Sequence, residues 1–129
     1  MDKIKIVIKG NHISPMGEVD LVAGTIGQVC KFYFEEEWKN LNKKITYKVG
    51  PTILGTYDII ADETTIPPHV LRAGGLPLEI GLTGFSSDKT IVKPTHWCPL
   101  GTVHNGAVIY TGGNEKEEDY IVYDGGMIT

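Results

Sequence analysis

The sequence predicts an all-β protein, an antiparallel β-sandwich with one or two short helical turns and a C-terminal extension. About eight short segments alternate apolar with polar residues, and turn residues separate them at roughly ten-residue spacing. The 129 residues include sixteen glycines and seven prolines, which is typical of a chain with many tight turns. No segment shows the helical pattern of roughly 10–15 residues that a parallel α/β architecture needs between its strands.

Alternation is clearest in the first half of the chain. It predicts strands over residues 3–9, 28–35 and 44–49, in which apolar side chains share one face and mostly polar side chains share the other. Residues 21–25 are expected to form a short edge segment. The side chains expected to face the core are Ile4, Ile6, Ile8, Cys30, Phe32, Phe34, Ile45, Tyr47 and Val49.

Two segments are expected to form short helical turns. Residues 35–41 begin with three acids, which suit the positive end of a helix dipole, and their Trp38 and Leu41 would meet on one side of a turn. We expect this turn to place Trp38 in the core, and core packing is also the favoured interpretation of Trp97. Residues 66–75 contain two prolines near the start and two glycines at the end, as a short helical turn does.

The second half of the chain continues the β pattern. Its predicted strands are residues 52–54, 57–61, 78–84, 90–92 and 103–110. Gly55 separates the first two of these strands, and residues 62–65 are expected to form a polar turn. Pro94 indicates an edge strand or a bulge, and Asn105 with Gly106 is expected to form a hairpin-type turn.

The chain is expected to form one β-sandwich domain over residues 1–106, followed by an extension over residues 107–129. A length of 129 residues fits one compact domain. In the extension a tyrosine followed by glycines occurs twice, at residues 110–113 and 123–126, on either side of the charge run at residues 115–119.

The apolar side chains of the extension have no core of their own. The candidate partner-binding residues are therefore Tyr110, Tyr120, Ile121 and Tyr123. We expect them to gain stability by docking on another chain, for example as an added strand.

Composition and charge argue against several classes of protein. The formal net charge is -4 and the pI about 5.5, which disfavours a nucleic-acid partner because phosphate binding needs clustered lysine and arginine. No apolar stretch approaches the roughly 18–20 residues of a membrane-spanning helix. The first residues alternate charge with isoleucine and contain no apolar signal-peptide core, so we expect synthesis without export and no membrane association.

No motif indicates catalysis, and we expect no enzyme and no catalytic, cofactor-binding or metal-binding residues. Nucleotide-binding glycine loops, G-x-S-x-G and H-E-x-x-H are absent. His96 and Cys98 are two residues apart, but zinc sites usually contain C-x-x-C or H-x-x-x-H pairs. A disulfide between Cys30 and Cys98 is the alternative to a small buried thiol at Cys30, and the buried thiol is favoured because cytosolic synthesis disfavours oxidation.

Five segments carry a distinctive order of apolar positions and turn glycines. They are FYFEEEWKNL at residues 32–41, IPPHVL at 66–71, GGL at 74–76, LEIGLTG at 78–84 and IVKPTHW at 91–97. This pattern resembles a recurring structural domain of tailed bacteriophages and prophages of Gram-positive hosts. The family looks like the immunoglobulin-like N-terminal attachment domains of baseplate, tail-fibre and head-fibre proteins, and the resemblance carries no catalytic residues.

The resemblance implies a non-enzymatic structural protein of the virion, made in the bacterial cytoplasm. Its expected partners are other phage structural proteins of the tail, baseplate or capsid lattice and further copies of itself, with a host surface glycan as a further possibility. Because the chain ends soon after the extension begins, an adaptor or decoration protein is expected rather than a complete fibre.

Two other function classes stay open. A carbohydrate-binding β-sandwich module of a surface or cell-wall-associated protein would need an exposed aromatic platform or a calcium site. A small enzyme would need paired carboxylates or an activated cysteine, and the acids of this chain lie mainly in predicted turns.

Overall fold

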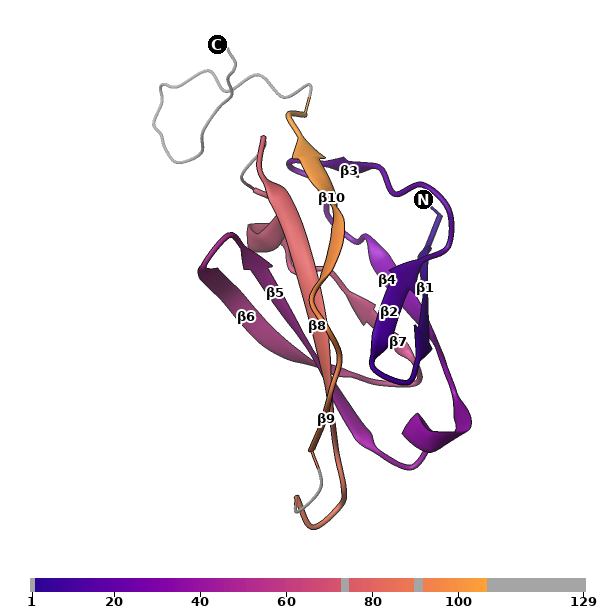
Figure 1. The fold of residues 1–129 in the computed structure, drawn as a ribbon. Coiled ribbons are helices and arrows are strands. Elements are labelled where there is room, and N and C mark those ends of the chain that lie inside the picture. Colours follow the sequence, from indigo (N-terminus) through magenta and orange to yellow (C-terminus); the bar gives the residue numbers. More distant parts are fainter. Residues whose placement is uncertain (1, 73–74, 90–91, 107–129) are drawn as a thin grey trace.

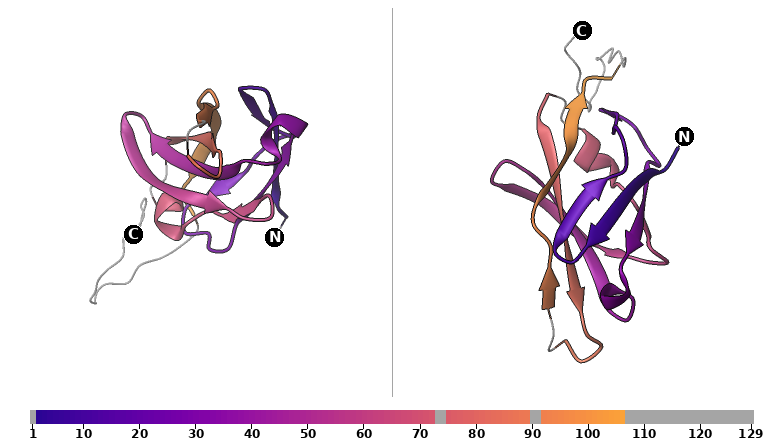
Figure 2. Two further views of the ribbon diagram at one scale, coloured as in Figure 1. Left: turned by 90° about the horizontal axis from the view of Figure 1, so that it is seen from below. Right: turned by 45° about the vertical axis from the view of Figure 1, so that its right-hand side comes forward.

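The structure is a computed structural model and describes residues 2–72, 75–89 and 92–106. Two β-sheets face each other with the apolar core between them (Figures 1 and 2). Apart from the strands, the described residues form two short 3-10 helices, η1 (Glu36–Trp38) and η2 (Pro68–Leu71). The predicted all-β sandwich with short helical turns is therefore confirmed.

Each sheet is built from strands that are distant in the sequence. The first sheet has the order β2-β1-β4-β7 and contains β1 (Ile4–Lys9), β2 (His12–Pro15), β4 (Val29–Phe34) and β7 (Glu63–Thr65). The second has the order β3-β10-β8-β5-β6 and contains β3 (Leu21–Val22), β5 (Asn42–Val49), β6 (Thr52–Ile59), β8 (Pro77–Phe85) and β10 (Cys98–His104). The short strand β9 (Val92–Pro94) pairs with the end of β8.

Both sheets are mixed, so the prediction of an antiparallel sandwich was wrong in this respect. β1 pairs with β2 antiparallel but with β4 parallel, and Ile6 lies opposite Phe32. β10 pairs with β3 in parallel, and Val103 lies opposite Leu21. The chain crosses to the second sheet at β3 and returns to the first at β4, which brings β4 beside β1 in the same direction. A half-buried strand alternates identically whichever way its neighbour runs, so the pattern could not reveal this pairing.

Several strand boundaries also differ from the prediction. The two strands expected around Gly55 are the single strand β6, in which Gly55 has a φ of +149° that interrupts the alternation. Part of the predicted polar turn is the strand β7, and the turn itself is made by Ala61 and Asp62, whose φ angles are +55° and +60°. The strand β2 was not predicted, and β10 begins five residues before the expected strand over 103–110.

The alternation correctly predicted which faces are buried. Of the nine side chains expected to face the core, six are buried and three are half-buried, which confirms the predicted phase of β1, β4 and β5. The largest fully buried side chains are Trp38, Tyr47, Phe32, Ile6, Ile8, Leu21, Ile45, Ile66, Leu71, Leu78, Ile80 and Leu82.

Trp38 lies in the core, as the sequence predicted, and it closes one end of the sandwich. Its side chain has no exposed surface, and its indole N–H donates to the carbonyl oxygen of Gly10 at 2.9 Å. The carboxylate of Glu35 accepts the N–H of the same glycine at 2.6 Å, so both backbone polar groups of Gly10 are hydrogen-bonded. On the opposite sheet Gly84 leaves room for the indole, because a Cβ there would lie 2.9 Å from Trp38 Cζ3 and 2.8 Å from Leu41 Cδ1.

This contact predicts the effect of a methyl group at Gly84. We expect Gly84→Ala to lower the free energy of unfolding by about 1–3 kcal/mol, because Trp38 is buried and cannot move away without strain. Gly81→Ala is the matched control on the same strand, since the three atoms nearest to a Cβ there all belong to Trp97, the closest at 3.0 Å, and Trp97 is 44% exposed. We expect it to cost less than about 1 kcal/mol because an exposed side chain can turn aside. Urea unfolding of both variants tests this, and equal losses would contradict it.

Candidate functional site

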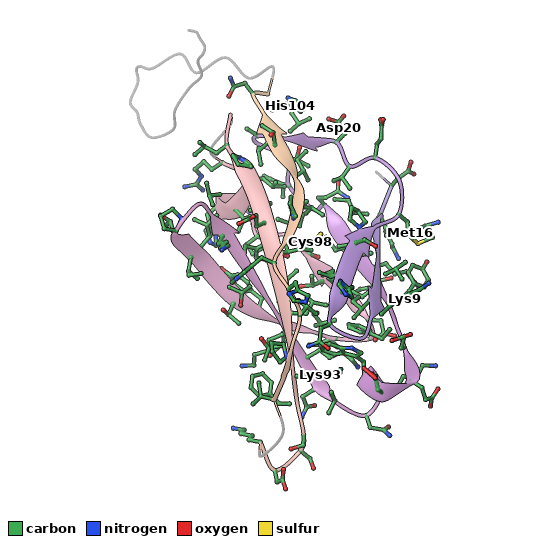
Figure 3. The ribbon with its side chains drawn as sticks, viewed as in Figure 1. Lys9, Met16, Asp20, Lys93, Cys98 and His104 are labelled. Carbon is green, nitrogen blue, oxygen red and sulfur yellow. The ribbon has the colours of Figure 1, made fainter. Side chains whose placement is uncertain are left out.

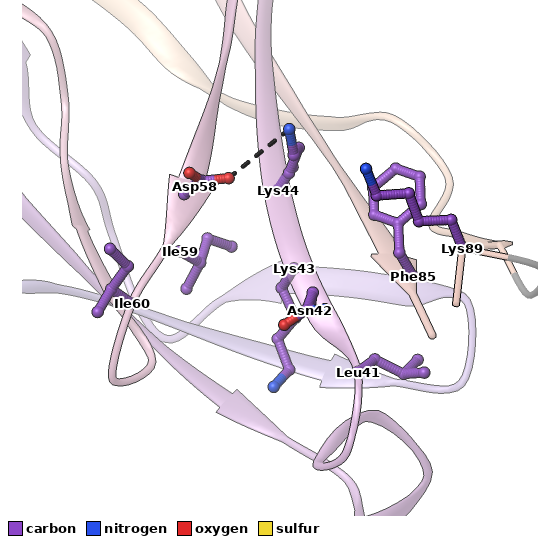
Figure 4. Close-up of a pocket in the computed structure, with 9 residues that line it drawn as sticks. All are labelled: Leu41, Asn42, Lys43, Lys44, Asp58, Ile59, Ile60, Phe85 and Lys89. Atoms are coloured by element: carbon purple, nitrogen blue, oxygen red, sulfur yellow. Dashed lines mark ion pairs between the residues drawn. The ribbon is translucent and has the colours of Figure 1, made fainter. Parts of the chain in front are cut away.

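A hollow of about 580 Å³ lies where the start of β5 meets the ends of β6 and β8 (Figure 4). We call it the basal hollow. Its lining residues are Leu41, Asn42, Lys43, Lys44, Asp58, Ile59, Ile60, Phe85 and Lys89. The strand register brings these elements together, because Lys43 lies opposite Ile59 on one side and Gly84 on the other.

The basal hollow lies at the end of the sandwich opposite to the one where β10 finishes. β10 and β8 are antiparallel, so the end of β10 pairs with the start of β8, with Thr102 opposite Pro77. Phe85 is at the other end of that nine-residue strand. Figure 3 shows the same separation, with His104 at one end of the molecule and Lys93 near the other.

Apolar and cationic groups share the lining of the basal hollow. Leu41, Ile59 and Phe85 are buried or half-buried, whereas Ile60 is 74% exposed. Lys44 forms an ion pair with Asp58 at 3.7 Å, drawn in Figure 4. Three lysines and one aspartate line the hollow, so its charge is positive overall. Such a lining suits an anionic group attached to an apolar one.

The pKa shifts in the described residues belong to groups outside the basal hollow. Burial raises the pKa of Cys30 to about 12 and also raises that of Tyr47, whose hydroxyl is buried without a hydrogen-bond partner in the described part of the chain. Burial also raises the pKa of Cys98. A hydrogen bond from Lys3, at 2.7 Å, lowers the pKa of Glu63. These shifts follow from core packing and a surface ion pair.

The structure does not bring His96 and Cys98 into one site. Cys98 is buried and His96 is exposed, and both cysteines are free, as the preferred interpretation of Cys30 predicted. The ring of His96 lies instead beside that of His12, with their centroids 5.2 Å apart. Across residues 2–72, 75–89 and 92–106, no three histidine, cysteine, aspartate or glutamate side chains gather closely enough to hold a metal ion.

Trp97 is exposed, which corrects the expectation that it packs in the core. It lies between β9 and β10, where the alternation is broken, and 44% of its surface is accessible. A Cβ built on Gly81 would lie 3.0, 3.0 and 3.5 Å from three adjacent ring atoms, which places the ring face over the glycine rather than beside it. The ammonium of Lys48 is 4.2 Å from the ring centroid and 3.5 Å from a carboxylate oxygen of Glu79.

The structure does not test the partner-binding residues that the sequence predicted. Tyr110, Tyr120, Ile121 and Tyr123 lie outside the described residues. Sequence reasoning missed the basal hollow, because its lysines are scattered along the chain and each looks like an ordinary solvated surface residue, with only Lys44 in the polar phase of a predicted strand. The register of β5 between β6 and β8 was needed to find it.

Comparisons with protein-family models, with curated proteins and with solved structures found no match to this chain. In the portion that the structure describes, no helix is both long enough and apolar enough to cross a membrane.

The burial of the two cysteines predicts their reactivity. In the folded chain at pH 8 we expect both thiols to react slowly with a disulfide reagent, because the raised pKa keeps them protonated and the fold covers them. After unfolding without reductant, two thiols per chain should be titrated. Fewer than two would reveal a disulfide, and rapid reaction of the native chain would show that the thiols are accessible.

Proposed function

We propose that the chain is a non-enzymatic structural protein of a tailed-bacteriophage virion, which docks on the tail, baseplate or capsid lattice as an adaptor, fibre-base or decoration protein. The observation that carries this proposal is that the segments resembling phage attachment domains make up much of the sandwich core. Phe32, Trp38, Ile66, Leu78 and Ile80 come from these segments, and each is buried. An immunoglobulin-like classification of the sandwich is part of the same proposal.

The chemistry of the described residues supports docking more than catalysis. Catalytic sites gather groups of perturbed pKa in a cleft. Here the shifted groups are two buried thiols, a buried tyrosine and one carboxylate in a surface ion pair, and none of them lines the basal hollow. A hollow with apolar and cationic sides instead suits a protein segment. Other phage structural proteins and further copies of the chain are the proposed partners.

Mass spectrometry of virions tests the proposal. Particles induced from the source bacterium and purified by density gradient should contain this protein in a fixed ratio to the major capsid protein. An abundant host cytosolic protein measured in the same fractions controls for contamination. Absence of the chain from the particles, or a ratio no higher than that of the contaminant, would overturn the structural role.

A carbohydrate-binding module is the second candidate function, and the exposed Trp97 is the observation that favours it. Its ring rests on Gly81, and the ion pair of Lys48 with Glu79 supplies hydrogen-bonding groups beside it. An aromatic ring can stack on the apolar face of a sugar ring while such polar groups bind hydroxyls. Trp38 is excluded from this role because it is buried.

Glycan-array binding distinguishes the two candidates. A sugar-binding module should lose its signal on Trp97→Ala and keep it on Tyr33→Ala, which removes another exposed aromatic from a strand of the other sheet. That result would count against the virion proposal unless the particles also contain the chain. An array without signal for the native chain would eliminate the sugar-binding candidate.

A further inference from the structure

The formal charge of the chain is concentrated in its C-terminal extension. Residues 107–129 contain five acids and one lysine, so they account for the whole net charge of -4, and residues 1–106 are neutral overall. The acids at positions 115 and 117–119 stand directly before an apolar and aromatic sequence, Tyr120-Ile121-Val122-Tyr123. The extension therefore presents carboxylates and large apolar side chains within one short segment.

The basal hollow has the complementary chemistry. Leu41, Ile59 and Phe85 contribute apolar surface to its lining, and Lys43, Lys44 and Lys89 contribute cationic side chains. Lys43 and Lys44 are neighbours on β5, so their side chains leave the strand on opposite faces. Only Lys44 is paired with the aspartate of the lining, at 3.7 Å. The ammonium of Lys43 lies 4.7 Å from the centroid of the Phe34 ring. A carboxylate that entered here would meet cations at the edge of an apolar surface, where charge pairing is screened less than in open water.

We infer that the basal hollow of one copy binds residues 115–123 of the extension of a second copy. This inference rests on the proposed function, since it explains how a virion protein could build a repeating array. The carboxylates of Glu117 and Glu118 would approach Lys43 and Lys89, and Tyr120 and its neighbours would cover the apolar lining.

The positions of the two features favour a second copy over the same chain. The extension leaves the sandwich after residue 106, at the end where β10 finishes, and the basal hollow is at the opposite end. The nine residues of β8 alone span about 30 Å at roughly 3.3 Å per residue. Residues 107–117, which lead to the first carboxylate assigned to the hollow, span at most about 36–40 Å, so within one chain they would have to run almost straight along the sandwich. In a head-to-tail arrangement, the extension of one copy begins beside the hollow of the next.

Such an interface joins two different surfaces, so it continues from copy to copy into a ring or a filament. Its dependence on charge should make it sensitive to salt. We expect the native full-length chain to associate with increasing concentration, and the association to weaken as ionic strength rises.

Charge reversal in the full-length chain provides the test, with analytical ultracentrifugation as the measurement. One variant carries Lys43→Glu and Lys89→Glu, and the other carries Glu117→Lys and Glu118→Lys. Each variant alone should associate at least about tenfold more weakly than the native chain, because like charges then face each other. A one-to-one mixture should recover association, because each hollow again meets an extension of opposite charge.

Matched controls separate this interface from other effects. Lys5→Glu with Lys9→Glu reverses two exposed lysines on β1 that do not line the hollow, and should leave association unchanged. Circular dichroism melts confirm that each variant is folded. If the hollow variant does not fold, two other variants carry the test. One is the extension variant with Glu117→Lys and Glu118→Lys, and the other replaces the hollow lysines by Lys43→Gln and Lys89→Gln. Each should associate more weakly than the native chain.

Three outcomes would overturn the inference. They are a native chain that stays monomeric at all concentrations, variants that associate like the native chain, and a mixture that fails to recover association. A native chain that stays monomeric, is destabilised by each pair of substitutions and regains its stability when all four are combined in one chain would show that the extension folds back on its own hollow. None of these results bears on whether the protein is present in virions, so the proposed function and this inference can fail separately.

Discussion

The indole of Trp38 is the contact on which the rest of the fold depends, because it joins both sheets at one end of the sandwich. Its N–H holds the turn between β1 and β2 through Gly10, and its ring fills the space left by Gly84 on β8. The backbone of Trp38, at the end of η1, also orients Leu41. The N–H of Leu41 donates to the Trp38 carbonyl oxygen at 3.1 Å, and the Leu41 side chain lines the basal hollow. The Trp38 side chain therefore contributes both to the closure of the core and to the position of the hollow. It can be buried because its one polar group, the indole N–H, is hydrogen-bonded to the backbone.

Sequence reasoning predicted what depends on local periodicity and missed what depends on pairing. The phase of the inward-facing residues was right because burial on one side imposes a period of two on any strand. The parallel pairing of β1 with β4 was missed because that period does not depend on the direction of the neighbour. β6 was split in two because Gly55 was read as a break between strands, whereas this glycine lies inside one continuous strand with a φ of +149°. Trp97 was assigned to the core on its size, although Pro94 had indicated a bulge or an edge strand just before the irregular stretch that turns it outward.

The candidate site was less predictable than the fold, for a physical reason. The residues of the basal hollow come from the start of one strand, the end of a second and the end of a third, so only the strand order brings them together. Lys44 belongs to the polar phase of the strand predicted over residues 44–49, so the alternation explains it as an ordinary surface residue, and Lys43 precedes that strand. The candidate residues that sequence reasoning did name, from Tyr110 to Tyr123, were chosen because no core was available to cover them. The lining of the basal hollow is positive overall, which is opposite in charge to the acids at positions 115 and 117–119 beside these candidate residues.

The two tryptophans have a practical consequence, because the structure places them in opposite environments. Trp38 has no exposed surface and Trp97 is 44% exposed. Intrinsic fluorescence from Trp38 should be blue-shifted and protected from aqueous quenchers such as iodide, whereas Trp97 should emit at longer wavelength and be quenched readily. The chain has no other tryptophan, so its emission divides into one reporter of the closed core and one reporter of the outer sheet surface. Loss of the fold and coverage of that surface can thus be followed separately in a single unlabelled sample.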